Sequence, residues 1–204
     1  MQKTFRFSFT AGFIWILLFL LTLCNGFLIW QNQNLKNEVQ RLSAESKVQV
    51  GEDFSGFKAV DIDNKPVTLE AASKTKKIIF LFSTTCPFCK KQNSYWTELL
   101  KTFDASKYEV FAVFNRKEEL KTVDEYFDTF GYKNAGTSIK VLFSEDETLE
   151  KYKLKSTPTT LVIDESDRVE KAWVGLWSPG VLAEANSFFN TSILKKELIK
   201  LPAQ

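Results

Sequence analysis

Hydrophobic and polar positions divide this chain into an apolar N-terminal segment and a longer region of mixed character. Residues 7–35 contain no charged side chain, and residues 9–30 are mostly Phe, Ile, Leu and Trp. A helix over those 22 positions would be about 33 Å long, which is enough to cross a bilayer. The pattern predicts a transmembrane anchor at residues 9–30, preceded by a tail at residues 1–8.

Charges before the apolar segment predict how the anchor is oriented. Lys3 and Arg6 precede it, so the positive-inside rule leaves residues 1–8 in the cytoplasm and places the C-terminal region outside, on the periplasmic or outer face of the cell membrane. A cleaved signal peptide is the alternative, but the apolar run is longer than a usual signal core and no small-x-small cleavage site follows. Leu23 before Cys24 does not fit a lipoprotein signal, so Cys24 is expected to be an inert membrane cysteine.

Residues 31–50 continue the helical pattern with a more polar composition. Leu28, Leu35 and Leu42 are seven apart, with Val39 between the last two. This favours a helical stalk that continues the anchor. Fewer than three heptads support the apolar seam, so it is only a weak indication of dimerisation. Residues 51–204 then form one further domain, long enough to bury a core.

Within residues 51–204, short apolar runs alternate with amphipathic stretches. The first two runs flank a turn at residues 63–66, which predicts a β-hairpin. The alternation that follows predicts an α/β domain with a mixed sheet covered by helices on both sides. Strands are expected at residues 57–62, 67–69, 78–82, 110–114, 139–143, 159–163 and 168–174, and helices at 86–103, 117–130, 146–152, 179–189 and 193–201.

Composition and charge exclude several classes of function. The 44% hydrophobic and 25% charged residues are ordinary globular values. Of 27 basic residues, Lys3 and Arg6 precede the apolar run, which leaves 25 against 25 acidic ones and argues against a nucleic-acid binder held by net charge. The chain has no histidine. Histidine acid–base catalysis, Ser-His-Asp triads and His-ligated zinc or copper sites are therefore excluded.

The strongest chemical signal is Cys86-Pro87-Phe88-Cys89, placed where an apolar strand passes into a helix. Free backbone N–H groups and the helix dipole favour a thiolate at a helix N-terminus. Pro87 fits the first helical turn, where no N–H is needed. Cys89 lies one turn along and is expected to be the more buried sulfur. The spacing predicts a redox pair in which Cys86 attacks a disulfide and Cys89 resolves the mixed disulfide.

Other interpretations of the two cysteines have less support. A structural disulfide that closes so short a loop restrains the unfolded chain very little. Zinc needs four ligands, and the chain offers neither histidine nor a second C-x-x-C, so we expect no metal and no cofactor beyond the cysteines. Chance occurrence is the remaining alternative.

These residues resemble the thioredoxin superfamily, and within it the membrane-anchored TlpA/ResA-like thiol-disulfide oxidoreductases. The resemblance covers roughly residues 50–190. It implies a thioredoxin-like fold in which Pro158 is cis and lies against the dithiol, and in which Thr157 offers its backbone to an extended substrate. The matching segments are IIFLFSTTCPFCKK, the VGEDF start with its DNKPVTL hairpin, STPTT before LVID, and WVG after DESDR.

Several positions depart from the family pattern. Thr85 stands where a tryptophan is common, and Gln92 stands where many ResA-like reductases have a glutamate. Phe80 replaces the acidic residue of thioredoxin itself. The sequence therefore shows no evident carboxylate base for Cys89, and the peroxiredoxin pattern is also lacking, because Ile79 takes the place of its proline.

Charged and aromatic side chains near the dithiol are expected to be mainly structural. Lys90 and Lys91 would favour a thiolate and acidic partners, but such a pair is more often a solvated helix face. Among the aromatics, Phe88 is the candidate for substrate contact because it lies between the cysteines. The other aromatics that could form an apolar rim are expected to fill the core: Phe54, Phe57, Trp96, Trp173 and Trp177.

The predicted function is a membrane-anchored enzyme that exchanges disulfides with extracytoplasmic proteins and has a membrane redox partner. Cys86 and Cys89 would carry the chemistry, and Pro87, Phe88, Thr157 and Pro158 would contact the substrate. The alternative is a non-catalytic thioredoxin-like binding module or assembly factor. A copper-delivery protein of related fold is disfavoured because its usual histidine ligand does not exist here.

Overall fold

The structure is a computed structural model that describes residues 9–45, 47–69 and 75–193. The chain divides into two compact units, Met1–Ser46 and Lys47–Gln204. The predicted tail at residues 1–8 and nearly all of the predicted helix at 193–201 lie outside the described residues.

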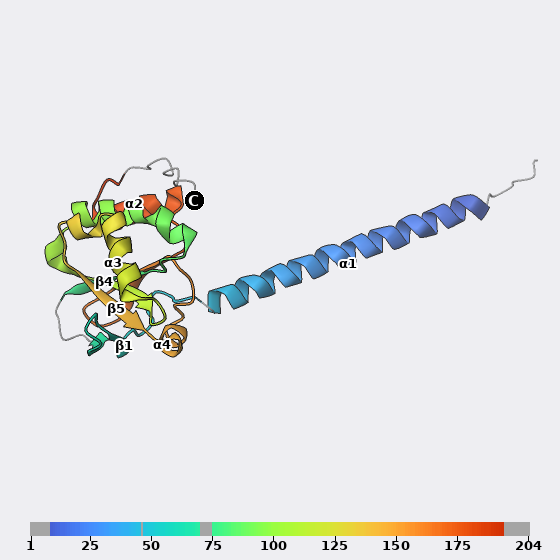
Figure 1. Ribbon diagram of the computed structural model, residues 1–204. Helices are drawn as coiled ribbons and strands as arrows, with labels where there is room; N and C mark the ends of the chain where they lie inside the picture. Colours follow the sequence, from blue (N-terminus) through green and yellow to red (C-terminus); the bar gives the residue numbers. More distant parts are fainter. Residues whose placement is uncertain (1–8, 46, 70–74, 194–204) are drawn as a thin grey trace, which may run out of the picture. The chain divides into compact units, whose positions relative to one another are not determined.

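The first unit is one α-helix, α1 (Phe9–Glu45), coloured blue in Figure 1. It contains a stretch, Ile14–Val39, that is long and apolar enough to cross a membrane. The helical pattern of the predicted stalk continues that of the anchor without a break as far as Glu45. Leu28, Leu35 and Val39 of the weak seam are exposed, and the side chain of Leu42 is outside the described set.

The second unit is built on a seven-stranded mixed sheet with the order β2-β1-β5-β4-β3-β6-β7. Strands β3, β4 and β5 are parallel, whereas β6 runs antiparallel to β3 and the β1–β2 hairpin joins the edge of β5. The strands are β1 (Phe57–Val60), β2 (Pro66–Leu69), β3 (Lys76–Leu81), β4 (Tyr108–Asn115), β5 (Ile139–Ser144), β6 (Thr159–Ile163) and β7 (Val169–Val174).

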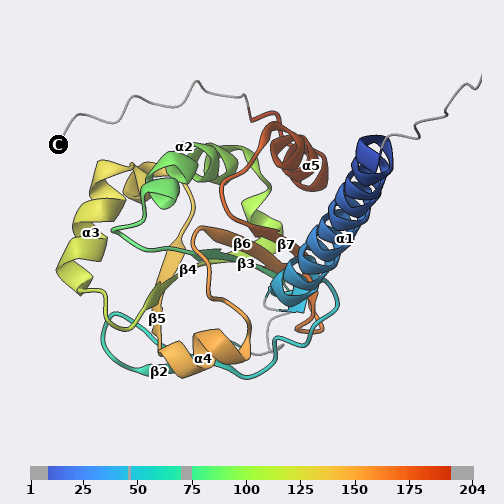
Figure 2. The same ribbon diagram turned by 90° about the vertical axis from the view of Figure 1, so that its right-hand side faces the viewer.

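In the described part of this unit, four α-helices cover the sheet, with three on one face and one on the other (Figure 2). They are α2 (Pro87–Thr102), α3 (Leu120–Thr129), α4 (Asp146–Lys151) and α5 (Pro179–Phe189), and two short 3-10 helices, η1 (Ala105–Lys107) and η2 (Tyr132–Asn134), connect them to the strands. The predicted mixed sheet with helices on both faces and an initial hairpin is confirmed.

The second unit has two hydrophobic cores, because side chains alternate between the two faces of the sheet along the central strands. In β3, Ile78 and Phe80 face the core shared with α2, α3 and α5, whereas Ile79 and Leu81 face the core shared with α4 and β1. Val48 is buried in the second core, so this unit begins to pack at the residues directly after α1.

Two expected elements are shorter than their apolar patterns. The chain turns at Asp61 because its carboxylate accepts hydrogen bonds from the N–H groups of Asp63 and Lys65, both at 2.9 Å, and β1 therefore ends at Val60. Helix α3 begins at Leu120 rather than at residue 117. There the Asn115 side chain accepts the N–H of Lys117 at 2.9 Å and holds a turn ahead of the helix.

One buried hydrogen bond fixes α2 against the strand that carries the Thr157–Pro158 loop. The indole Nε1–H of Trp96 donates to Oγ1 of Thr160 at 2.8 Å, and both residues are fully buried. Thr160→Val keeps the side-chain shape but leaves the indole N–H without its acceptor, which is expected to lower the free energy of unfolding by about 1–3 kcal/mol.

Denaturant unfolding followed by tryptophan fluorescence measures this effect. Thr68→Val on the exposed side of β2 is the matched control, because Thr68 is also a strand residue but is solvent-exposed. Equal unfolding midpoints for the two variants would contradict the role assigned to the Trp96–Thr160 bond.

Candidate active site

The dithiol lies where β3 passes into α2. After Leu81 the chain turns through Ser83–Thr85, and the Cys86 N–H donates to the Ser83 carbonyl at 3.2 Å. Cys86 is the N-cap of α2 and Pro87 opens its first turn. The Cys86 Sγ accepts the backbone N–H of Cys89 at 3.4 Å. The expected arrangement of a sulfur facing unpaired helix N–H groups is therefore present.

Cys86 is the more reactive sulfur. It is half-buried, and burial is the largest single influence and raises its pKa. Hydrogen bonds from the Thr157 side chain and from the N–H groups of Cys89 and Phe88 act in the opposite direction. Together they outweigh burial and hold the pKa of Cys86 below its ordinary value.

Cys89 has the opposite properties. Its side chain is fully buried, and burial is the main reason why its pKa rises to about 12. Its thiol also donates toward the Cys86 sulfur, which raises the pKa of Cys89 further and lowers that of Cys86. One sulfur thus favours the thiolate while its neighbour keeps the proton. Both are free thiols in this structure.

The Thr157–Pro158 loop lies against Cys86, although about seventy residues separate them in the sequence. The Thr157–Pro158 peptide bond is cis, as the resemblance implies. The Cys86 thiol donates to the Thr157 carbonyl at 3.5 Å. Gly175, whose φ of +89° suits glycine, donates its N–H to the Pro158 carbonyl at 2.7 Å and so anchors the loop to the end of β7.

Of the six aromatic residues named as a possible rim, one is exposed and five are buried. Phe88 is 54% exposed, and Pro87 beside it is also exposed. The five other aromatics considered as a rim are buried and fill the core, which confirms that prediction: Phe54, Phe57, Trp96, Trp173 and Trp177. Phe88 and Pro87 are thus the accessible apolar surface that borders Cys86.

Gln92 supports the loop after β7. It is fully buried one turn beyond Cys89, and its Oε1 accepts the N–H of Trp177 at 2.9 Å. Its Nε2 has no partner among the described residues. The amide therefore joins α2 to the segment that follows β7, and, having no ionisable proton, it leaves Cys89 without a base on this side.

A carboxylate that the sequence reasoning missed lies on the other side of the dithiol loop. Oε1 of Glu118 accepts the Ser83 hydroxyl at 2.9 Å and the Thr84 N–H at 3.2 Å, and Oε2 accepts the Thr84 hydroxyl. Glu118 follows β4, which pairs in parallel with β3. The carboxyl ends of neighbouring parallel strands meet at one edge of a sheet. This rule could have indicated from the sequence that Glu118, after β4, lies close to the dithiol loop, after β3.

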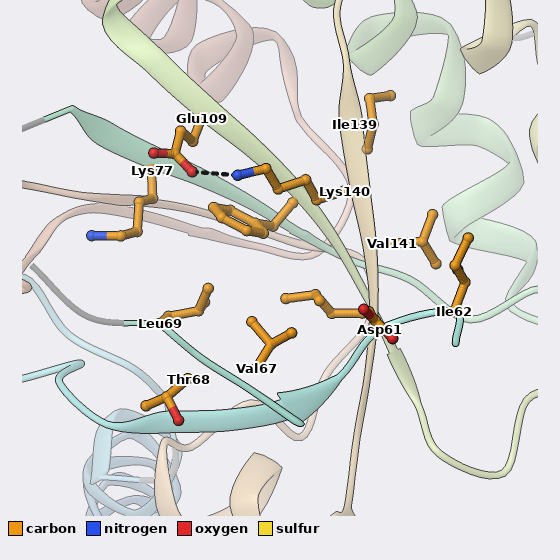
Figure 3. A pocket seen from close by; sticks show the side chains of 12 residues that line it. Asp61, Ile62, Val67, Thr68, Leu69, Lys77, Glu109, Ile139, Lys140 and Val141 are labelled. Atoms are coloured by element: carbon orange, nitrogen blue, oxygen red, sulfur yellow. Dashed lines mark hydrogen bonds and ion pairs between the residues drawn. The ribbon is translucent and has the colours of Figure 1, made fainter. Parts of the chain in front are cut away.

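Two hollows lie at opposite ends of the parallel strands. The smaller one, about 340 Å³, borders the active site and is lined by Ser83, Glu118 and Thr157 among others. The larger one, about 560 Å³, is shown in Figure 3, where Lys140 reaches Glu109. Lys77, Glu109 and Ile139 place it at the amino ends of β3, β4 and β5, away from Cys86, so of these two hollows the smaller one borders the dithiol loop.

Known proteins with similar sequences are thiol-disulfide oxidoreductases. A protein of Geobacillus thermodenitrificans described as thiol-disulfide oxidoreductase ResA is 24% identical over 160 residues, which cover 78% of this chain and 84% of the relative. A protein of the same description from Halalkalibacterium halodurans is 22% identical over 131 residues, covering 64% of this chain and 71% of its own. These relatives agree with the predicted enzyme class and with Cys86 and Cys89 as its cysteine pair.

Solved structures support the same fold. The thioredoxin domain of a thiol-disulfide oxidoreductase from Bacteroides vulgatus matches with a TM-score of 0.55 at 12% identity, over 71% of this chain and all of that one. A thioredoxin-family thiol:disulfide interchange protein from Chlorobium tepidum matches with a TM-score of 0.52 at 21% identity, over 69% of this chain and 97% of that one. Both are similar in fold, and the predicted thioredoxin-like fold is confirmed.

The family model described as AhpC/TSA family matches residues 50–189, which include every strand and helix that the structure describes in the second unit. Together with the thioredoxin-like sheet and the dithiol at the start of α2, this match shows that the chain belongs to the AhpC/TSA family of thioredoxin-like proteins.

Proposed function

We propose that this protein is a membrane-anchored, extracytoplasmic thiol-disulfide oxidoreductase that exchanges disulfides with other proteins through its Cys86-Pro87-Phe88-Cys89 dithiol. One observation carries the proposal. Two adjacent sulfurs have opposite properties, because Cys86 is accessible with a lowered pKa whereas Cys89 is buried with a pKa of about 12. A nucleophile beside a protected resolving thiol is what two-step exchange requires.

The exchange proceeds by two displacements. The Cys86 thiolate attacks one sulfur of a substrate disulfide, a Cys86–substrate S–S bond forms, and the other substrate sulfur leaves with the electron pair. Cys89 then loses its proton and attacks Cys86, and the second substrate sulfur leaves. The substrate gains two electrons and the enzyme ends with a Cys86–Cys89 disulfide. The reverse sequence oxidises a substrate dithiol.

Substrate docking is proposed at the surface that surrounds Cys86. The cis Thr157–Pro158 loop lies beside the Cys86 sulfur, so an extended segment placed along Thr157 would bring its disulfide to that sulfur. Exposed Phe88 and Pro87 add an apolar surface next to it. Apolar contact with polypeptide and backbone pairing would together align the substrate.

The apolar helix supports the proposed location. Ile14–Val39 is long enough to cross a bilayer, and Lys3 and Arg6 precede it, which favours an extracytoplasmic position for the dithiol domain. A disulfide-exchanging pair functions in such a compartment and needs a redox partner to reset it. A membrane protein is the partner we propose, because the anchor keeps the dithiol near the bilayer.

Trapping of mixed disulfides tests the function. In a Cys24→Ala background, Cys89→Ser removes the resolving sulfur, so partners attacked by Cys86 remain covalently bound. We expect covalent adducts that a reducing agent releases. Non-reducing electrophoresis of the full chain, expressed in a cell membrane, detects them. The Cys86→Ser variant is the matched control and should hold at least about tenfold fewer adducts.

Two results would contradict the proposal. One is an equal yield of adducts from the Cys89→Ser and Cys86→Ser variants. The other is full biological function of the variant that lacks both cysteines, which would favour the binding-module alternative.

A further inference from the structure

Resolution of the mixed disulfide needs a proton acceptor for Cys89. Its buried thiol attacks only after losing a proton, and its pKa of about 12 leaves very little thiolate at neutral pH. Within α2, Gln92 lies one turn along and cannot take a proton. Two buried phenols, Tyr126 and Tyr132, are electrostatically coupled to Cys89, but burial raises the pKa of both, so they keep their protons.

Glu118 is the carboxylate that the tertiary structure brings to this place. Its two oxygens accept hydrogen bonds from Ser83 and Thr84, the residues that join β3 to the dithiol. Within the described part of the chain, no basic side chain forms an ion pair with it. The carboxylate is half-buried and borders the hollow that opens to solvent next to Thr157, so a proton received there has a route to water.

Ser83 links the carboxylate to the resolving sulfur. Its backbone N–H acts on the Cys89 sulfur, while its hydroxyl donates to Glu118 at 2.9 Å. The same hydroxyl lies 3.1 Å from Oγ1 of Thr85, the residue directly before Cys86. Ser83 thus contacts Cys89 through its backbone N–H and Glu118 through its hydroxyl, and the hydroxyl can pass a proton because it both donates and accepts.

We infer that Glu118 is the proton acceptor for Cys89 in the resolving step and that it acts through the Ser83 hydroxyl. This inference rests on the proposed function and adds a residue to it. As Cys89 attacks, a Cys86–Cys89 S–S bond forms and the bond from Cys86 to the substrate sulfur breaks, with the electron pair leaving on the substrate sulfur. The Cys89 proton passes to the Ser83 oxygen while the Ser83 proton passes to Glu118. The protonated carboxyl then returns its proton to the departing thiolate or to water.

Other charged groups near Glu118 already form ion pairs or hydrogen bonds with other side chains. Asp146 of α4 is bound to Lys117 and Asn115, and Glu150 of the same helix pairs with Lys155 at 3.4 Å. Asn115, Asp146, Glu150 and Lys155 all line the hollow. Because these charges are paired, Glu118 is the carboxylate left to exchange protons with the dithiol loop.

Charge repulsion alone predicts the opposite change in the rate of attack by Cys89 when Glu118 is removed, which makes the inference testable. A negative carboxylate near Cys89 disfavours the thiolate, so if Glu118 acted only as a charge, its removal would speed the attack by Cys89. If Glu118 accepts the proton, its removal slows that attack. Glu118→Gln keeps oxygen and nitrogen atoms for the bonds to Ser83 and Thr84 while it removes the charge and the basicity.

The experiment follows both displacements with one aromatic disulfide, 5,5′-dithiobis(2-nitrobenzoate). Added in slight excess to the reduced full chain in detergent, in a Cys24→Ala background, it releases one coloured thiolate when Cys86 attacks and a second when Cys89 displaces the mixed disulfide. Stopped-flow absorbance separates the two releases. For Glu118→Gln we expect the second release to be slower by about 10–100-fold at pH 7, and the first to change much less.

The pH profile separates proton transfer from a structural defect. Between about pH 6 and pH 8 the second release should vary little in the parent chain, whereas in Glu118→Gln it should rise by about tenfold per pH unit as the Cys89 thiolate fraction rises. Ser83→Ala, which breaks the link and leaves the carboxylate, should show the same steep profile. Glu119→Gln is the control. The Glu119 carboxylate is next to Glu118 in the sequence, is exposed, and accepts no hydrogen bond from the N–H groups at the start of α3.

Each result has a definite consequence. An unchanged or faster second release in Glu118→Gln, with the first release intact, overturns the role of Glu118 while leaving the proposed function standing. Absence of the first release in the parent chain contradicts the proposed function itself.

Discussion

At pH 7, iodoacetamide is expected to alkylate Cys86 at least about 10³-fold faster than Cys89 in the reduced protein. Only the thiolate reacts, and a pKa of about 12 leaves Cys89 with a thiolate fraction of about 10⁻⁵ at this pH. Cys86 has a lowered pKa and is half-exposed. Accessibility and ionisation therefore act in the same direction.

The pH dependence of alkylation is a second test of the difference in pKa between Cys86 and Cys89. The rate for Cys86 should rise with pH and level off below the pH expected for a free cysteine, because its pKa is lowered and the thiolate population saturates earlier. The rate for Cys89 should still be rising above about pH 10. Mass spectrometry of the labelled Cys24→Ala chain, sampled over time, measures both rates.

A denatured sample provides the control, because unfolding removes the helix N-terminus and the burial that distinguish the sulfurs. In denaturant the two cysteines should react within about threefold of each other. Similar rates in the folded protein would contradict the proposed assignment of Cys86 as nucleophile and Cys89 as resolving thiol.

Loss of either partner of the buried Lys77–Asp167 ion pair is expected to lower the free energy of unfolding by about 3–5 kcal/mol. Lys77 Nζ lies 2.8 Å from Asp167 Oδ1, and the two residues are only 3% and 5% exposed. The pair joins β3 to the turn between β6 and β7. Lys77→Met leaves a buried carboxylate without its cation, and Asp167→Asn leaves a buried ammonium without its anion.

A double-variant cycle separates this pairing from general loss of packing. Lys77→Met combined with Asp167→Asn should be less destabilised than the sum of the single variants, because neither unpaired charge remains. Denaturation of the full chain in detergent, followed by tryptophan fluorescence, gives the values. Lys65→Met at the exposed Lys65–Asp63 pair is the control and should leave the unfolding midpoint unchanged. Additive effects in the cycle would contradict the coupling.

Most of the fold could be predicted from local patterns because its elements have distinct periodicities. The continuous apolar run of β3 marks a strand buried on both faces, and the stripe through Cys89, Trp96 and Leu99 marks the buried side of α2. The ends of elements were less predictable. Side chains such as Asp61 and Asn115 stop the regular hydrogen bonding, and an apolar pattern does not record this.

The roles of single polar residues in the site were harder to predict. The sequence alone shows that Gln92 cannot serve as a base, but the bond from the Trp177 N–H to its Oε1 depends on where the chain passes after β7. Glu118 lies in the charged first turn of the helix that the sequence predicts over residues 117–130, where a solvated side chain is expected. Its contact with Ser83 arises only because β3 and β4 pair in parallel, with Leu81 opposite Val113.

Local sequence patterns suffice to predict the apolar helix, the order of strands and helices, and a dithiol at the start of a helix, because each depends on residues within a few turns of one another. The resemblance to a known family added the cis Pro158, which those local patterns do not encode. The distant groups that surround the sulfurs become evident only in the folded protein, since strand register brings Thr157 to Cys86 and Glu118 to Ser83. Burial, which separates the pKa values of the two cysteines, is likewise a property of the packed sheet and helices.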